Sequence, residues 1–159
     1  MIHPSFGRRR LCAGLMIGSI APFQLFAAAG HGGEPYAKTT NKAFDDVVFD
    51  LEFAITQANY RLTGKNRVGE SIAEMRDTDY PKGTLLHFCN SQIAASVLDI
   101  RPEYLLNMPC KISVREIDAG KQVIVETYLL QTGSDPELDP ILESINATIR
   151  EIVEFGTGD

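Results

Sequence analysis

The sequence has 159 residues, of which 44% are hydrophobic, and this length and composition are typical of one globular domain. Its formal net charge of -6 excludes a nucleic-acid-binding protein, because phosphate recognition requires clustered lysine and arginine side chains. The single basic run, Arg8-Arg9-Arg10, belongs to a targeting segment instead.

Residues 1–29 have the features of a signal peptide. The arginine run precedes a short apolar stretch, Leu11–Phe26, and the small residues Ala27-Ala28-Ala29 provide a cleavage site. The apolar stretch is interrupted by glycine and proline and is too short for a membrane span, which needs about 20 apolar residues. Paired arginines resemble a twin-arginine export signal, and an ordinary secretion signal remains the alternative. Both routes predict an exported protein, periplasmic or secreted.

Removing residues 1–29 changes the charge and the cysteine count. The predicted mature chain keeps 12 basic and 21 acidic side chains, a net charge of -9, and has no predicted membrane span. Two cysteines remain, Cys89 and Cys110, and an even pair in an exported protein is compatible with a disulfide. Residues 30–35 are glycine-rich and are predicted to form a flexible leader.

The first half of the mature chain predicts a strand, a helix and a second strand. Tyr36–Thr40 is the first strand, and Asn41 is the predicted cap of a helix that extends to Asn59. The second strand is predicted at Tyr60–Thr63, with a turn at Gly64-Lys65-Asn66. The apolar residues of the helix recur near the helical period and are Phe44, Val47, Val48, Leu51, Phe53, Ala54, Ile55 and Ala58.

The middle of the chain predicts a third strand with short helical segments on both sides. Val68–Arg76 is predicted to form one or two helical turns, and Asp77–Gly83 forms a polar loop. Thr84–Cys89 is the third strand. Asn90 then caps a short helix that extends to Asp99 and ends before a proline.

The last third of the chain predicts a hairpin and a long helix. Cys110–Ile117 alternates as a half-buried strand does, and a tight turn at Asp118–Lys121 leads into a returning strand, Gln122–Leu130. Asp139-Pro140 starts an amphipathic helix that ends at Gly156. Its apolar residues are Ile141, Leu142, Ile145, Ile149, Ile152, Val153 and Phe155.

These elements predict an α+β fold for residues 36–159. Their order is strand, helix, four strands and helix, with a short helical insert between the third and fourth strands. An antiparallel sheet with both long helices on one face would bury both apolar stripes.

The same segments resemble the domain-of-unknown-function 302 family. The resemblance covers about residues 36–155, and its most specific parts are Phe88-Cys89-Asn90 and Met108-Pro109-Cys110. The other matching residues are Ala94, Leu98, Pro102, Ile112 and Val114. The family implies the strand-helix-four-strand-helix fold of the TATA-binding-protein-like architecture and a homodimer, and it implies no particular reaction.

The candidate site residues are His87, Cys89, Met108 and Cys110. Side chains alternate along a strand, so His87 and Cys89 share one face of the third strand, and the apolar Leu86 and Phe88 share the other. Cys110 is predicted to face the core with Ile112 and Val114. This parity argues against a Cys89–Cys110 disulfide, although a bulge at the strand ends could break it.

Four interpretations of this region stay open. The two cysteines form a structural disulfide, or remain buried thiols, in a purely structural or interaction domain. Alternatively, His87, Cys89, Met108 and Cys110 bind copper, or some of them bind a non-covalent haem. A third interpretation is a reactive thiol or redox protein that uses Cys89, next to the cap of a helix. The fourth is a binding module for an apolar small ligand or a partner protein.

From these alternatives we predict an exported, non-enzymatic α+β binding protein. Its predicted site is the Cys89/Cys110 region, with copper or non-covalent haem as the candidate cofactors. We also expect a homodimer, with a periplasmic partner protein or a small ligand, and no catalytic residues.

Overall fold

The structure is a computed structural model that describes residues 34–158. The predicted signal peptide, residues 1–29, and most of the predicted leader, residues 30–35, lie outside the described residues. None of the helices between residues 34 and 158 is long and apolar enough to cross a membrane.

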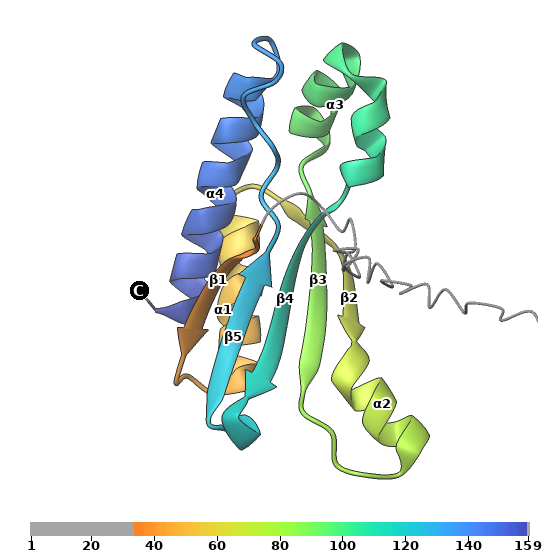
Figure 1. Ribbon diagram of the computed structural model, residues 1–159, viewed down its shortest axis with the longest axis vertical. Coiled ribbons are helices and arrows are strands. Elements are labelled where there is room, and N and C mark those ends of the chain that lie inside the picture. Colours follow the sequence, from red (N-terminus) through yellow and green to blue (C-terminus); the bar gives the residue numbers. More distant parts are fainter. Residues whose placement is uncertain (1–33, 159) are drawn as a thin grey trace, which may run out of the picture. The chain divides into compact units, whose positions relative to one another are not determined.

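Five antiparallel strands form one sheet in the order β1-β5-β4-β3-β2 (Figure 1). The strands are Tyr36–Thr40 (β1), Arg61–Arg67 (β2), Gly83–Cys89 (β3), Cys110–Ile117 (β4) and Gln122–Thr127 (β5). The α-helices are Phe44–Gln57 (α1), Val68–Arg76 (α2), Ser91–Ile100 (α3) and Asp139–Thr157 (α4). Two short 3-10 helices complete the fold, Pro102–Asn107 (η1) and Asp118–Gly120 (η2). The predicted α+β fold is confirmed.

The two long helices, α1 and α4, cover one face of the sheet (Figure 1). Alternate strand residues point toward them and are at most 2% exposed: Leu86, Phe88, Ile112, Val114, Val123 and Val125. The helices contribute Leu51, Ile55, Leu142, Ile149 and Ile152, which are buried to the same degree. Each of these side chains contributes about 1.5–3 kcal/mol by leaving water, so this layer is the core of the domain.

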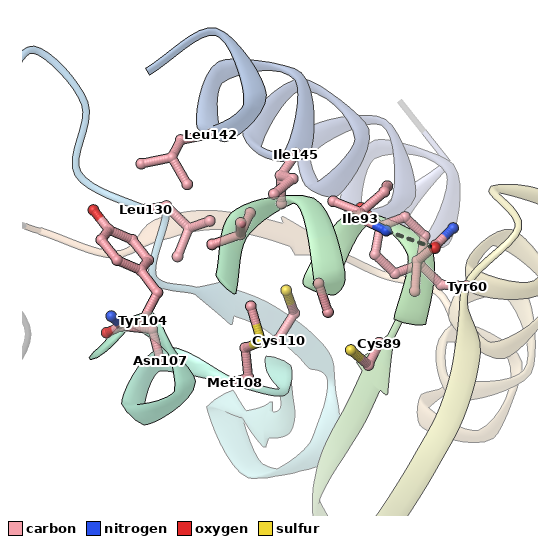
Figure 2. Close-up of a pocket in the computed structure, with 13 residues that line it drawn as sticks. Tyr60, Cys89, Ile93, Tyr104, Asn107, Met108, Cys110, Leu130, Leu142 and Ile145 are labelled. Carbon is pink, nitrogen blue, oxygen red and sulfur yellow. Dashed lines mark hydrogen bonds between the residues drawn. The ribbon is translucent and has the colours of Figure 1, made fainter. Parts of the chain in front are cut away.

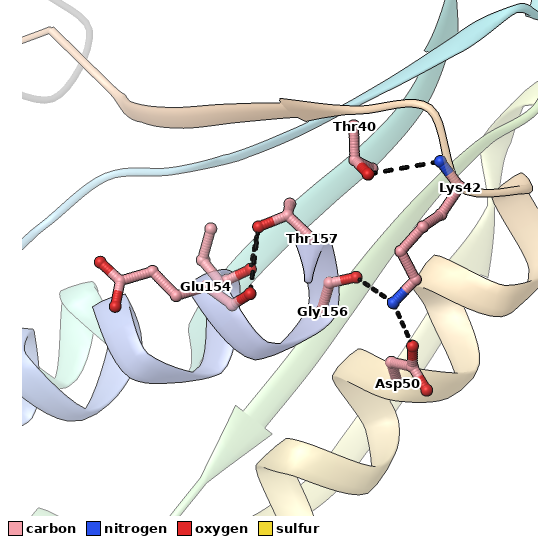
Figure 3. Close-up of polar contacts among 7 residues, drawn as sticks. Thr40, Lys42, Asp50, Glu154, Gly156 and Thr157 are labelled. Atoms are coloured by element: carbon pink, nitrogen blue, oxygen red, sulfur yellow. Dashed lines mark hydrogen bonds and ion pairs between the residues drawn. The ribbon is translucent and has the colours of Figure 1, made fainter. Parts of the chain in front are cut away.

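The end of α4 is tied to the start of α1 through Lys42 (Figure 3). The Lys42 ammonium donates to the carbonyl oxygen of Gly156 at 3.0 Å and forms an ion pair with Asp50. A cation beside the last carbonyls of a helix is favourable, because that end of the helix carries partial negative charge. Two helices that are distant in the sequence are therefore joined at one side chain.

The predicted turn at Gly64-Lys65-Asn66 is wrong, because β2 continues through it to Arg67. The register between β2 and β3 shifts between Leu62 and Gly64, so Thr63 forms a bulge. Glycine within a strand often marks a bulge or the close approach of another group, and Gly64 pairs with His87 on β3. A turn and a bulge use the same residue type, which explains the error.

Predictions at five other positions also need correction. Asn41 does not cap α1, which has Ala43 at its N-cap without a side-chain bond; the Asn41 side chain accepts from Gln122 instead. The last strand ends at Thr127 rather than Leu130, and Asp139 lies in the first turn of α4 rather than at its cap.

Two residues predicted to be in the core, Phe53 and Phe155, are 47% and 50% exposed, and their rings pack against each other with centroids 5.8 Å apart.

Candidate functional site

The strand parity predicted for the two cysteines is found in the sheet. Leu86 and Phe88 are buried on the helix side of β3, while His87 and Cys89 alternate with them. Cys110 pairs in register with Phe88 and lies two residues before buried Ile112, so it is on the core side of β4. Both cysteines are free thiols, and the disulfide considered above is therefore not formed in this structure.

The two thiols nevertheless line one pocket at the end of the sheet (Figure 2). Strand β3 stops at Cys89, and the chain turns there into α3, so the alternation of a regular strand no longer separates its side chain from Cys110. Met108, just before β4, lines the same pocket. We call it the sulfur pocket; its other walls are Tyr60, Asn90, Ile93, Ala94, Val97, Tyr104, Asn107, Leu130, Leu142 and Ile145.

The sulfur pocket is narrow. The space open to the centres of water molecules is about 30 Å³, which is enough for a very few small atoms or one ion. Its walls come from α3, η1, α4 and the segment after β5, and most of them are aliphatic or aromatic. The pocket is therefore a small apolar space beside three sulfur atoms.

Tyr60 places an unsatisfied hydroxyl in this region. The residue is 7% exposed, its ring packs edge-on against Phe88 at 5.6 Å, and its hydroxyl oxygen has no hydrogen-bond partner among the described residues. Burial, with smaller contributions from the charges of Cys110 and Cys89, raises the pKa of Tyr60 to about 12. A buried hydroxyl without a partner is rare in proteins and points to a group that completes it.

Cys110 is a protonated thiol near neutral pH. Burial raises its pKa to about 11, and the neighbouring Cys89 also raises it. Because the thiolate is the nucleophile, Cys110 is a poor nucleophile in this state. A positive ion in the pocket would reverse this preference, since a coordinating thiol gives up its proton.

The predicted cap at Asn90 is confirmed, and it also positions the pocket. The Asn90 Oδ1 atom accepts from the backbone N–H groups of Gln92 and Ile93 at 3.0 and 3.2 Å, as a helix cap does. The Asn90 Nδ2 atom donates to the carbonyl oxygen of Asn59 at 3.0 Å. One side chain therefore fixes Cys89, the start of α3 and the turn that carries Tyr60.

The structure brings together three of the four predicted site residues. His87 does not line the sulfur pocket; it pairs in register with Gly64 on β2 and Lys111 on β4. Among residues 34–158 no three histidine, cysteine, aspartate or glutamate side chains cluster as metal ligands do, so a metal site here depends on the Met108 thioether. Tyr60 was missed because nothing in its local sequence indicates that it reaches Cys89 and Cys110.

A second, larger pocket adjoins the first and has about 570 Å³ of open space. The two pockets share the walls Tyr104, Asn107, Cys110 and Leu130. Leu130 is held by a two-way amide pair: its N–H donates to Asn146 Oδ1, and Asn146 Nδ2 donates to its carbonyl oxygen, both at 2.8 Å. The wall between the pockets is therefore fixed to α4.

Comparison with known proteins gives a family and a fold. The sequence model of the family described as "Domain of unknown function DUF302" matches residues 36–155. The crystal structure of an uncharacterized conserved protein DUF302 from Bacillus stearothermophilus is similar, with a TM-score of 0.66 and 19% sequence identity. The match covers 76% of this chain and 95% of that one, and it supports the shared fold. No curated protein matches the sequence.

Proposed function

The chain belongs to the DUF302 family, and we propose that it is an exported, non-enzymatic binding protein whose sulfur pocket holds one Cu(I) ion. The observation that carries this proposal is the meeting of Cys89, Met108 and Cys110 in a single narrow pocket. Thiolate and thioether sulfur atoms are soft ligands, and soft ligands favour Cu(I) over harder cations. Export follows from the signal peptide predicted at residues 1–29.

The chemistry of the walls suits this ion. Two thiolates and one Cu(I) carry a net charge of -1, which an apolar pocket disfavours unless a donor compensates for it. The Tyr60 hydroxyl lacks a partner among the described residues and is close enough to both cysteines to be affected by their charge. We assign to it a hydrogen bond to a metal-bound thiolate, which would orient that ligand and stabilise its charge.

The size of the pocket favours copper over haem. Pockets for organic ligands usually have about 300–1,000 Å³, and the sulfur pocket has about 30 Å³ of open space. The residue best suited to bind haem iron, His87, does not line this pocket. A space of this size is enough for one ion, and Cys89, Met108 and Cys110 all line it.

A redox protein is the second candidate, because both thiols are free and line the same pocket. In exchange with an external disulfide, a bond would form between Cys89 and Cys110, and the external disulfide would take up the two electrons and two protons and leave as two thiols. Copper binding and oxidation need the same two thiols, so a thiol titration alone does not separate them. Metal stoichiometry under anaerobic, reducing conditions does separate them.

The test is a Cu(I) titration of the full chain without oxygen, in competition with bicinchoninate. We expect one ion per chain. Cys89→Ser and Cys110→Ser should each weaken binding more than about 100-fold, since even loss of a group that only hydrogen-bonds to a metal ligand costs about 10–100-fold. Met108→Leu should weaken binding by about ten-fold, because it removes one neutral ligand and keeps the shape.

Two substitutions serve as matched controls. Cys12→Ser removes the remaining cysteine of the chain, and His87→Ala removes the predicted ligand that lies outside the sulfur pocket. Neither should change the affinity for Cu(I). Loss of binding in His87→Ala, or equal binding in wild type and Cys110→Ser, would overturn the proposed site.

A further inference from the structure

The larger pocket has the dimensions of a small-molecule site. Its open space of about 570 Å³ lies within the usual range of about 300–1,000 Å³ for ligand pockets. Strands β3, β4 and β5 form its floor through Leu85, Ser113 and Glu126, which are neighbours in register across the sheet. Residues of η1 and of the segment after β5 form its sides.

Lys111 gives this pocket a positive charge. It is exposed, and none of the residues 34–158 forms an ion pair or hydrogen bond with its ammonium group. The one carboxylate in the lining, Glu126, is already engaged by Arg115 at 2.9 Å. The unpaired charge that a ligand in this pocket would meet is therefore the positive charge of Lys111, although the net charge of the whole chain is -6.

The other walls provide apolar surface and one further donor. Leu85, Leu129 and Pro109 line the pocket together with the ring of Tyr104. The side-chain amide of Asn107 also lines it and has no hydrogen bond within the described part of the chain. A positive group and a free amide beside apolar walls match a ligand with an anionic end and an apolar body.

The pocket needs little rearrangement before a ligand binds. Leu130 forms part of its wall and is fixed to α4 by the two 2.8 Å hydrogen bonds of Asn146. Thr127 at the end of β5 donates to the carbonyl oxygen of Lys111 at 2.8 Å, which fixes the backbone below the ammonium group. A wall that is already ordered reduces the entropy lost on binding.

We propose that this second pocket binds a small organic anion with an apolar body, a carboxylate or a sulfonate. Lys111 and Asn107 bind the anionic end, and Leu85 and Tyr104 contact the apolar body. This site adjoins the proposed copper site through the shared residues Tyr104, Asn107, Cys110 and Leu130, but Lys111 and Leu85 line only the larger pocket.

The test uses the full chain and 8-anilinonaphthalene-1-sulfonate, an aromatic anion whose fluorescence reports binding. We expect saturable binding at one site per chain. Lys111→Gln should weaken it about five-fold, the upper range for an ion pair that water still reaches. Lys121→Gln removes the same charge from the distant β4–β5 turn and should leave the affinity unchanged.

Two further measurements make the outcome decisive. The uncharged N-phenyl-1-naphthylamine should bind equally well to wild type and Lys111→Gln, since it lacks the anion. Cys89→Ser should keep the sulfonate affinity, so failure of the copper site and failure of this pocket can be told apart. Equal weakening by Lys111→Gln and Lys121→Gln, or no weakening by either, would overturn the proposal.

Discussion

Cys110 lines both pockets, and its thiol is in an environment that differs strongly from that in an unfolded chain. Burial raises the pKa of this thiol to about 11. Its neighbour Tyr60 has the same kind of shift and the same main cause. Two acidic groups that prefer to stay neutral make this end of the domain sensitive to alkaline pH.

We expect the folded state to lose stability as the pH rises from about 9 to about 11. Unfolded Cys110 titrates near its ordinary pKa of 9.0, whereas the folded thiol keeps its proton to about 11, so alkali favours the unfolded chain. Between pH 8 and pH 10 the loss from this one group should be about 1 kcal/mol. Urea denaturation at both pH values measures it.

The comparison is made in a Cys12→Ser background, so that the cysteine outside residues 34–158 does not contribute. Cys110→Ala should lower stability at both pH values through the lost packing, but its pH dependence should be flatter than that of the parent. An equally steep decline in Cys110→Ala would show that another group is responsible.

At the scale of elements, the close contact between α1 and α4 requires glycine at position 156, because any side chain there would clash with α1. Gly156 lies in the last turn of α4, where a Cβ atom would be 2.4 Å from Leu51 Cδ2 and 2.5 Å from Leu51 Cγ. Leu51 is fully buried, so it has little room to move. Lys42 binds the carbonyl oxygen of the same glycine, which holds the two helices together at this point (Figure 3).

Gly156→Ala should therefore destabilise the protein, although alanine is the better helix former. The steric conflict costs about 1–3 kcal/mol, and the gain in helix propensity returns at most about 1 kcal/mol. We expect a net loss of about 1–2 kcal/mol by thermal or urea unfolding. Ser144→Ala, at an exposed position of the same helix, should change stability by less than about 0.5 kcal/mol. A more stable Gly156→Ala variant would refute the close contact.

The elements themselves were predictable where local patterns decide them. The bounds of β1 and β4 are those predicted from alternation and turn residues, and Asn90 caps α3 as its position indicates. Gly64 was misread because a bulge and a turn both use glycine. Phe53 was wrongly predicted to be a core residue. The helical period identifies the apolar face of α1, but it does not show how much of that face contacts the sheet.

For the whole molecule, the site depended on contacts that the sequence does not encode locally. Strand parity correctly predicted that His87 and Cys110 lie on opposite faces of the sheet. It did not predict that Cys89, at the end of β3, lines the same pocket as Cys110. Tyr60, α3 and α4 reach the same pocket from segments about 30 to 85 residues apart. Such a pocket follows from the packing of the sheet end, so the sequence indicated its sulfur-containing residues but not its walls.

The export that we propose concerns the whole chain, and the arginine run offers a direct experiment. Produced in a Gram-negative bacterium, the protein should be recovered from the periplasm with an intact mass that corresponds to residues 30–159.

Arg9 belongs to both arginine pairs of the run, and Arg9→Lys breaks both pairs while keeping the positive charge. The twin-arginine route requires the pair, whereas a general signal requires only the charge. We therefore expect Arg9→Lys to retain the precursor in the cytoplasm; unchanged export of this variant would identify the general route, and an uncleaved wild-type chain in the cytoplasm would refute the signal peptide.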